Sequence, residues 1–495
     1  MEADLRRTYE GAEMIIGARG RLINARRGLS RLSGQSIVAC PYVKRRDLPV
    51  RASRFILGWS VVASALLGLT ASPYLRASPY VAQRLLSSTA IASGAYATSL
   101  GKFYGVRSLS TGTVGNVFDV TVWTGKDAFT DLGPGWVNDA MGSRFGGWND
   151  KYHAAVWTTG TTATDLQPSS GGYSRSMVNG LAPGVEVGWG SGAGFVHAMM
   201  WRGTAASAVD LNPTGYTTSE AYGVSATAQV GSAQLSNVEH AMLWRGSKSS
   251  YVDLQPRTGF VASRAYSISR GRVVGAGSIH DKTFNWAHAL MWTGTADSVV
   301  DLNPAGFGAS VATKIVGDWV VGYGIPVGGK THALMWDLST PTPTVYDLHD
   351  DAAIGYDTST AWNISSSGAI AGVTLMYPDA SVPGGNFNAA IGWTPTGPRL
   401  PGDADLDGKV SFADFQILEE NLGSTDSWWK TGDFNDDRVT DQADYALLIR
   451  HYGESVGAGA AASVPEPVAV VWVGVMGIML VGRRFRGERG RKSCL

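Results

Sequence analysis

The stretch "GDADLDGKVSFADF" at residues 402–415 places aspartates at alternating positions, followed by a glycine and one further aspartate. Carboxylates this close together repel one another unless a cation lies between them. Calcium takes about six to eight oxygen ligands at about 2.3 to 2.6 Å, which a loop supplies from positions 1, 3, 5, 7, 9 and 12, with glycine at position 6. Counted from the first aspartate, those positions hold Asp403, Asp405, Asp407, the Lys409 carbonyl, Ser411 acting through water, and Asp414, with Gly408 at the turn. The sequence therefore predicts a calcium site.

Thirty residues later, "GDFNDDRVTDQADY" repeats the pattern. The corresponding positions hold Asp433, Asn435, Asp437, the Val439 carbonyl, Asp441 and Asp444. Arg438 stands where the turn glycine belongs, and a side chain at a positive φ costs on the order of 1 kcal/mol. We therefore predict two Ca²⁺ sites, of which the second binds more weakly. Residues 402–453 carry ten Asp and two Glu against two Lys and two Arg, so this segment should be partly unfolded without cations.

Each loop is followed by apolar residues at helical spacing. After the first loop these are Phe412, Phe415, Ile417, Leu418 and Leu422, and the predicted helix ends at Gly423. Two calcium loops, each followed by one helix, resemble the type I dockerin duplication. The resemblance implies a small all-α module, folded by calcium, that plugs into a cohesin on another protein. A calcium-clamped spacer without a partner is the alternative interpretation.

A repeat fills the middle of the chain. Tryptophan recurs at Trp123, Trp157, Trp201, Trp244, Trp292, Trp336 and Trp393, which defines seven units. The first six are each followed by an Asp-Leu pair, whose aspartates are Asp131, Asp165, Asp210, Asp253, Asp301 and Asp347. Three copies, such as "HAMMWRGTAASAVDLNP", are similar enough to establish duplication. A repeat of this length indicates an array of supersecondary units.

Each unit contains four short extended segments separated by turn residues. In the fifth unit they are "RAYSIS", "RVVGAGS", "HALMW" and "VVDL". Four strands per unit is the pattern of a β-propeller blade, because a small twisted sheet buries its faces only between neighbours. The sequence therefore predicts a mainly β fold, a propeller of about seven four-stranded units. Six or eight blades, and a solenoid, are the alternatives.

The repeat motif, "HALMW" followed by Gly-Thr and "DLNP", resembles the bacterial extracellular HAF repeat over residues 103–400. This resemblance implies a secreted β-rich repeat and nothing about its ligand. The terminal units depart from the pattern: Asp119 replaces the histidine in the first and Ala389 in the last. Such departures are common at the ends of repeat arrays.

The repeated polar residues are expected to have structural roles. Equivalent positions of a propeller are spread around the ring, so five histidines in such positions (His153, His197, His240, His288 and His332) do not converge on one metal ion. The repeated tryptophans should pack blade against blade, and the repeated aspartates should cap turns. No Gly-x-Ser-x-Gly or His-Glu-x-x-His motif occurs, and no catalytic residue is assigned.

The N-terminal part of the chain resembles a secretory signal. A basic patch at residues 51–54 precedes an apolar run at 55–71 and small residues, which predicts a signal-peptide region at 50–97. Cleavage near Ala71 or within 89–97 is compatible with this pattern. Residues 1–49 are then either a long leader or an over-extended gene start. A buried core helix at 55–71 is the alternative.

The C-terminal part has three components after a linker at 457–463. The motif Pro465, Glu466 and Pro467 precedes an apolar run at 468–482 and a basic end beginning with Arg483 and Arg484. This tail at 464–492 resembles the PEP-CTERM sorting signal of exosortase substrates, which implies a sorting protease as partner, a transmembrane helix at 468–482 before processing, and export to the envelope or beyond. A plain membrane anchor is the alternative.

Composition supports this organisation. The formal net charge is zero, so no overall field favours nucleic acid. With 63 Gly and 17 Trp but only 17% charged residues, the composition is typical of all-β structure. We predict a non-enzymatic, exported cell-surface protein, a propeller platform joined to a calcium module for assembly or display, with a cohesin-like or envelope protein as partner. A secreted polysaccharide-active enzyme or a lectin is the alternative, and polysaccharide is then the ligand.

Overall fold

The structure is a computed structural model that describes residues 75–76, 78–85, 92–109, 117–158, 162–280, 287–350, 358–376, 387–397 and 399–456. Its contacts divide the chain into two units, Met1–Pro73 and Tyr74–Leu495, and every described residue belongs to the second. Several predicted segments lie outside the described residues: the leader 1–49, the apolar run 55–71, the linker 457–463 and the tail 464–492 with Pro465, Glu466, Pro467, Arg483 and Arg484. Within the described ranges, no helix has both the length and the apolar character that a membrane crossing requires.

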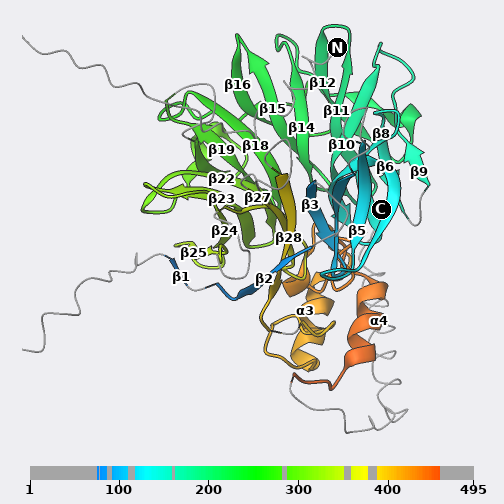
Figure 1. The fold of residues 1–495 in the computed structure, drawn as a ribbon, viewed down its shortest axis with the longest axis vertical. Helices are drawn as coiled ribbons and strands as arrows, with labels where there is room; N and C mark the ends of the chain where they lie inside the picture. The colour runs from blue at the N-terminus through cyan, green and yellow to red at the C-terminus, as the bar shows by residue number, and fades with distance from the viewer. Residues whose placement is uncertain are drawn as a thin grey trace, which may run out of the picture. The chain divides into compact units, whose positions relative to one another are not determined.

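Seven sets of four antiparallel strands follow one another along the chain (Figure 1). The first two sets share the long strand β6 (Phe129–Met141), whose residues up to Pro134 pair with β5 and whose residues from Gly135 pair with β7. The first set is β3 (Ala92–Ser99), β4 (Lys102–Leu109), β5 (Val117–Trp123) and the start of β6; the second is the rest of β6, β7 (Arg144–Asn149), β8 (Ala154–Trp157) and β9 (Ala163–Asp165).

The next three sets are separate four-stranded sheets with the same order. They are β10 (Arg175–Ala182), β11 (Val185–Gly192), β12 (Phe195–Trp201) and β13 (Val209–Asp210); β14 (Ser219–Val224), β15 (Gln229–Leu235), β16 (Val238–Trp244) and β17 (Val252–Asp253); and β18 (Ala262–Ser269), β19 (Arg272–Ser278), β20 (Ala287–Trp292) and β21 (Val300–Asp301). Short 3-10 turns, η1 (Ala205–Ser207) and η2 (Ala296–Ser298), precede the last strand of two of them.

The sixth and seventh sets close the ring. The sixth is β22 (Phe307–Val316), β23 (Trp319–Pro326), β24 (His332–Asp337) and β25 (Thr344–Asp347), with β1 (Leu75–Arg76) added in parallel to its edge. The seventh takes β26 (Thr360–Ile364), β27 (Ile370–Met376) and β28 (Phe387–Pro395) from the end of the repeat and β2 (Tyr80–Arg84) from its beginning. Its strands contact β3 of the first set, so the sheets form a closed β-propeller and the predicted mainly β propeller fold is confirmed.

The propeller begins earlier in the sequence than predicted. Strand β2 and most of β3 lie inside the range 50–97 that the sequence analysis assigned to a signal-peptide region, and both precede residue 103, the predicted start of the repeat. The repeat motif cannot reveal β2, because β2 is an isolated strand that pairs with β28 more than 300 residues away in the sequence. Cleavage within 89–97 would remove the strand that closes the ring.

The repeated tryptophans fill the spaces between blades, as predicted. Six of the seven, all except Trp157, are fully buried, and Trp157 is 3% exposed. Trp244 of β16 packs in one cluster with Val187 of β11 and Met200 of β12, which belong to the preceding blade. Each blade therefore buries its apolar face only when its neighbour is in place.

A polar bridge also recurs between blades. The backbone N–H of the alanine after the repeated histidine position, which holds Ala389 in the last unit, donates to a serine Oγ of the next blade. There are six such pairs: Ala154–Ser176, Ala198–Ser219, Ala241–Ser263, Ala289–Ser310, Ala333–Ser359 and Ala390–Ser93, at 2.8 to 3.0 Å. The last pair joins the seventh blade to the first. The same hydrogen bond thus links successive blades and closes the ring.

Residues 399–456 fold as a small helical module beside the propeller (Figure 1). It contains α3 (Phe412–Asn421), the 3-10 turn η3 (Trp429–Thr431) and α4 (Gln442–His451), around a core that includes Leu418, Trp429 and Leu448. Ser411 and Asp441 cap the two helices through capping boxes completed by Asp414 and Asp444. Each predicted calcium loop therefore leads directly into one helix.

Replacement of one repeated tryptophan should destabilise the propeller strongly. Trp244→Ala leaves a cavity between two blades and should lower the free energy of unfolding by about 3 to 5 kcal/mol. Tyr251→Ala in the same blade is the control, because its ring is 39% exposed, and it should cost less than about 1 kcal/mol. Urea unfolding of the two variants measures the difference, and equal losses would contradict the packing role.

Candidate metal centre

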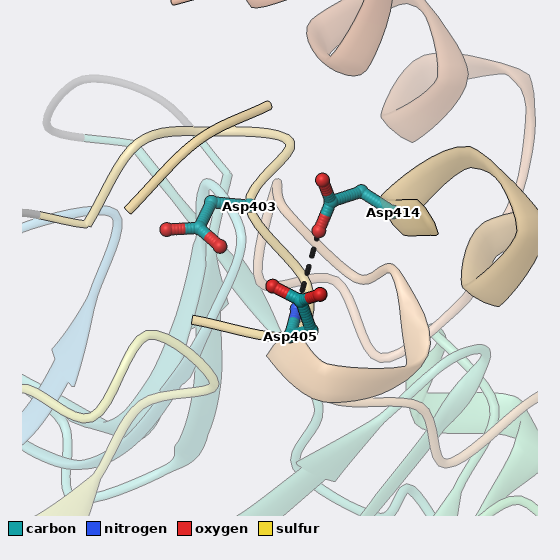
Figure 2. Close-up of side chains that lie close together, drawn as sticks. All are labelled: Asp403, Asp405 and Asp414. Carbon is teal, nitrogen blue, oxygen red and sulfur yellow. Dashed lines mark hydrogen bonds between the residues drawn. The ribbon is translucent and has the colours of Figure 1, made fainter. Parts of the chain in front are cut away.

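The first predicted calcium loop brings three of its carboxylates together. One oxygen from each of Asp403, Asp405 and Asp414 lies within 4.8 Å of the other two (Figure 2). Asp403 Oδ2 accepts a hydrogen bond from the Gly408 N–H at 3.0 Å, but its Oδ1 is buried and has no hydrogen-bond partner. Because Asp403 is only 2% exposed, that oxygen needs a ligand other than solvent.

Asp414 links the start and the end of the first loop through hydrogen bonds. Its Oδ1 accepts from the N–H groups of Ala404 and Asp405 at 2.8 and 3.2 Å, and its Oδ2 accepts from the Ser411 N–H at 2.8 Å. The helix α3 begins at the next residue after Ser411, so the carboxylate at position 12 is held at the start of a helix. Asp407 Oδ1 accepts from the Lys409 N–H at 2.8 Å, which keeps the middle of the loop turned.

The second loop repeats this arrangement. Asp444 Oδ1 accepts from the Phe434 and Asn435 N–H groups at 2.8 and 3.2 Å, and its Oδ2 accepts from the Asp441 N–H at 2.9 Å. Asp433 is fully buried and accepts from the N–H groups of Asp437 and Arg438, each at 3.1 Å. Asp437 Oδ1 in turn accepts from the Val439 N–H at 2.9 Å. The two loops therefore share one backbone design.

The backbone conformation of the two turns is also shared. Arg438 adopts φ 63°, in the left-handed region that its counterpart Gly408 occupies at φ 84°. The fourth loop positions, Leu406 and Asp436, likewise have positive φ values of 65° and 57°. Arg438 therefore adopts the positive φ that favours glycine, as expected. Its backbone is strained there, whereas Gly408 of the first loop is not.

Electrostatics within the loops favour a bound cation. Burial, followed by the charges of Asp436, Asp444 and Asp437, raises the pKa of Asp433 well above its usual range. Burial also raises the pKa of Asp403, and it raises the pKa of Asp444 to about 6. Oxygen ligands alone, in loops with buried carboxylates, are the donor set that calcium prefers over transition metals.

Each repeated histidine pairs with an aspartate of its own blade. Each Nδ1 contacts Oδ2 of the repeated aspartate in its own blade at 2.7 to 2.8 Å. The other oxygen of that aspartate accepts from the backbone N–H two residues later, for example Asn212 at 2.8 Å. Among the described residues, no histidine belongs to a cluster that could hold a metal. These pairs cap the turn at the end of the second to sixth blades.

Sequence reasoning missed how the module meets the propeller. Asp426, Trp428, Asp436 and Arg438 of the module contact propeller residues, and none of the four was predicted to do so. One sequence signal for these contacts was available: Asp436 and Arg438 are charged residues at loop positions that do not ligate the ion. Their partners include Asp139, the Leu181 carbonyl and the Ser366 N–H, which lie in separate repeat units and are brought together only by ring closure.

Comparison with known proteins finds similarity only among solved structures. No family model matches the chain, and no curated protein matches it. Among solved structures, the chain is similar to the β-propeller domain of the Trilobed protease from Pyrococcus furiosus, at 11% identity and a TM-score of 0.38, over 62% of this chain and 94% of that one. It is also similar to Pyrococcus horikoshii acylaminoacyl peptidase (11%, TM-score 0.38, 58% and 50% of the two chains) and to TolB from Acinetobacter baumannii (10%, TM-score 0.35, 57% and 77%).

The prediction of a non-enzymatic surface platform is contradicted by these neighbours. The first two of these neighbours are a propeller domain of a protease and a peptidase. The chain spans half the length of the acylaminoacyl peptidase that it matches, and at these identities the similarity extends to the fold alone. No peptidase activity follows for this chain. The cohesin-like partner, the sorting protease and export remain predictions.

Calcium affinity at the second loop should decrease as the pH is lowered. Because the pKa of Asp444 is raised to about 6, protonation stabilises the metal-free fold below the ordinary carboxyl pKa, and this contribution is lost as pH rises through 6. Calcium binding needs the ionised form, so Asp444 alone should weaken the affinity about fourfold between pH 7.5 and pH 5.5. Calorimetric titration at the two pH values checks this, and a pH-independent affinity would contradict it.

Proposed function

We propose that the chain is a calcium-binding propeller protein in which two Ca²⁺ ions fold residues 402–453 into a dockerin-like module. The observation that carries this proposal is the first loop, where a buried and unpartnered Asp403 oxygen lies beside carboxylate oxygens of Asp405 and Asp414. An unsatisfied buried carboxylate oxygen is costly unless a cation is bound to it.

The ligands of the first ion follow from the loop positions. Asp403, Asp405, Asp407 and Asp414 supply carboxylates, Lys409 supplies a carbonyl, and Ser411 acts through water. The bound ion supplies the positive charge that four neighbouring carboxylates otherwise lack. Because Asp414 also belongs to the capping box of α3, the ligand that closes the site starts the helix.

The second ion has a parallel ligand set on the other half of the duplication. Asp433, Asn435, Asp437, the Val439 carbonyl, Asp441 and Asp444 occupy the same loop positions. Neutral Asn435 replaces the Asp405 carboxylate, and Arg438 carries a strained φ. Both differences lie within the loop, and both favour weaker calcium binding at this site.

Removal of the first site should halve the calcium stoichiometry. Asp403→Ala with Asp407→Ala deletes two ligands, so calorimetry of the full chain should report one bound ion where the parent chain binds two. The matched control is Glu419→Ala with Glu420→Ala, which removes two acidic residues of α3 that lie outside both loops. Unchanged stoichiometry in the first variant, or loss in the control, would contradict the assigned site.

A further inference from the structure

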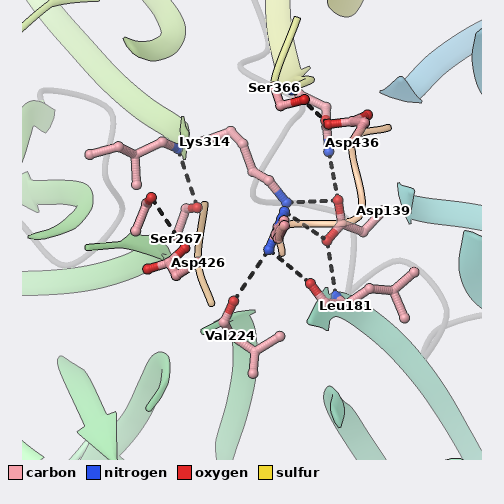
Figure 3. Close-up of polar contacts among 12 residues, drawn as sticks. Asp139, Leu181, Val224, Ser267, Lys314, Ser366, Asp426 and Asp436 are labelled. Atoms are coloured by element: carbon pink, nitrogen blue, oxygen red, sulfur yellow. Dashed lines mark hydrogen bonds and ion pairs between the residues drawn. The ribbon is translucent and has the colours of Figure 1, made fainter. Parts of the chain in front are cut away.

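The second calcium loop makes hydrogen bonds to the propeller as well as within itself. Arg438 Nη1 donates to the Leu181 carbonyl of β10 at 2.9 Å and to the Val224 carbonyl of β14 at 3.4 Å. These carbonyls lie in the third and fourth blades, at or near the end of the innermost strand (Figure 3). The Arg438 side chain is only 11% exposed, so this contact is part of the protein interior.

The same arginine approaches a buried carboxylate of the second blade. Arg438 Nη2 lies 3.9 Å from Asp139 Oδ2, and Asp139 is 1% exposed. Lys314 Nζ of β22 donates to Asp139 Oδ1 at 2.7 Å, and Asn363 Nδ2 of β26 donates to the same oxygen at 2.9 Å. Burial raises the pKa of Asp139, but the charges of Lys314 and Arg438 outweigh it, and the net pKa is lowered. The carboxylate is therefore ionised and gains from the cation of the module.

Two module aspartates bind further turns of the propeller. Asp436 Oδ1 accepts from the Ser366 N–H at 2.7 Å (Figure 3). The Asp436 carbonyl accepts from the Gly142 N–H at 2.6 Å. Asp426 accepts from the Arg270 N–H and from Ser269 Oγ. These contacts reach the second, fifth and seventh blades, at the turns that follow the innermost strands.

An apolar anchor completes the contact. Trp428 is 3% exposed and belongs to a propeller core cluster, where its ring packs edge-on against Trp319 at 4.9 Å between ring centroids. Gly317, in the turn between β22 and β23, makes room for this ring: a Cβ there would lie 1.9 Å from it. A buried tryptophan and a buried arginine at the centre of a contact are typical of a specific protein interface.

We infer that the second calcium loop is an interaction surface whose partner is the propeller of its own chain, and that calcium binding and this docking stabilise each other. The inference rests on the proposed calcium function. Its physical basis is that the Arg438 N–H donates to Asp433, the first ligand of the loop, while the Arg438 side chain donates to the propeller. The backbone conformation that surrounds the ion is thus the one that presents the arginine.

This coupling explains why the sixth position of the second loop holds Arg438, although glycine would adopt the same backbone conformation with less strain. A residue held at positive φ persists where surrounding contacts fix it, and here the carbonyls of two blades and a buried carboxylate do so. By linkage, docking should raise calcium affinity by the same factor by which calcium favours docking. The affinity of the second loop should therefore depend on propeller residues that are far from the ion.

The test uses the full chain with the first site removed by Asp403→Ala and Asp407→Ala, so that calorimetry reports the second loop alone. In this background, Gly317→Ala places a methyl group against the Trp428 ring and should weaken calcium binding about fivefold or more. Gly184→Ala is the matched control: it also lies in a hairpin turn of the propeller at positive φ, but its Cβ would meet nothing within 4 Å. Its calcium affinity should be unchanged.

Equal calcium affinities for Gly317→Ala and Gly184→Ala would overturn the inference while leaving the calcium function intact. Absence of calcium binding in the parent background would instead overturn the proposed second site and the inference with it. If Gly317→Ala does not fold, the calcium affinity of Arg438→Gly in the same background tests the inference instead. Relief of strain alone predicts tighter binding, whereas loss of docking predicts weaker binding, and a tighter site would contradict the coupling.

Discussion

The buried carboxylate of Asp139 is the constraint around which the two parts of the chain are organised. A carboxylate that is 1% exposed is strongly destabilising unless cations and hydrogen-bond donors surround it. Its donors come from three different blades: the Leu181 N–H, Lys314 Nζ and Asn363 Nδ2. Arg438 of the module adds a second cation. The buried charge of Asp139 is therefore compensated only when the ring is closed and the module is docked.

The closed ring rests on repeated local interactions rather than on any single contact. The second to sixth blades each offer a histidine–aspartate pair that caps the last turn, a tryptophan that fills the space beside the blade, and an alanine N–H that binds the next blade. Since each interaction has a counterpart at the neighbouring position, the innermost strands are placed regularly about one axis. That regularity brings side chains from separate repeats to one end of the ring, where the module binds.

Much of this could be predicted from sequence because duplication exposes it. Copies of the Trp and Asp-Leu motifs defined the repeat units, and the extended segments between turn residues indicated four strands in each. The spacing of Asp403, Asp405, Asp407 and Asp414 indicated the first loop. Ring closure by β2 could not be predicted, since a five-residue strand without the motif carries no signal of its partner β28. The role of Arg438 was also hidden, because its contacts depend on how the seven blades and the module meet.

In the proposed coupling, the calcium sites of the module and the end of the propeller that contacts it act as one unit. Hydrogen exchange followed by mass spectrometry, on the full chain with calcium and with chelator, tests this most directly. We expect calcium to slow exchange in the loops and also in the propeller turns around Gly142, Gly317 and Ser366, whose backbone or neighbours contact the module. Protection confined to residues 402–453 would contradict it.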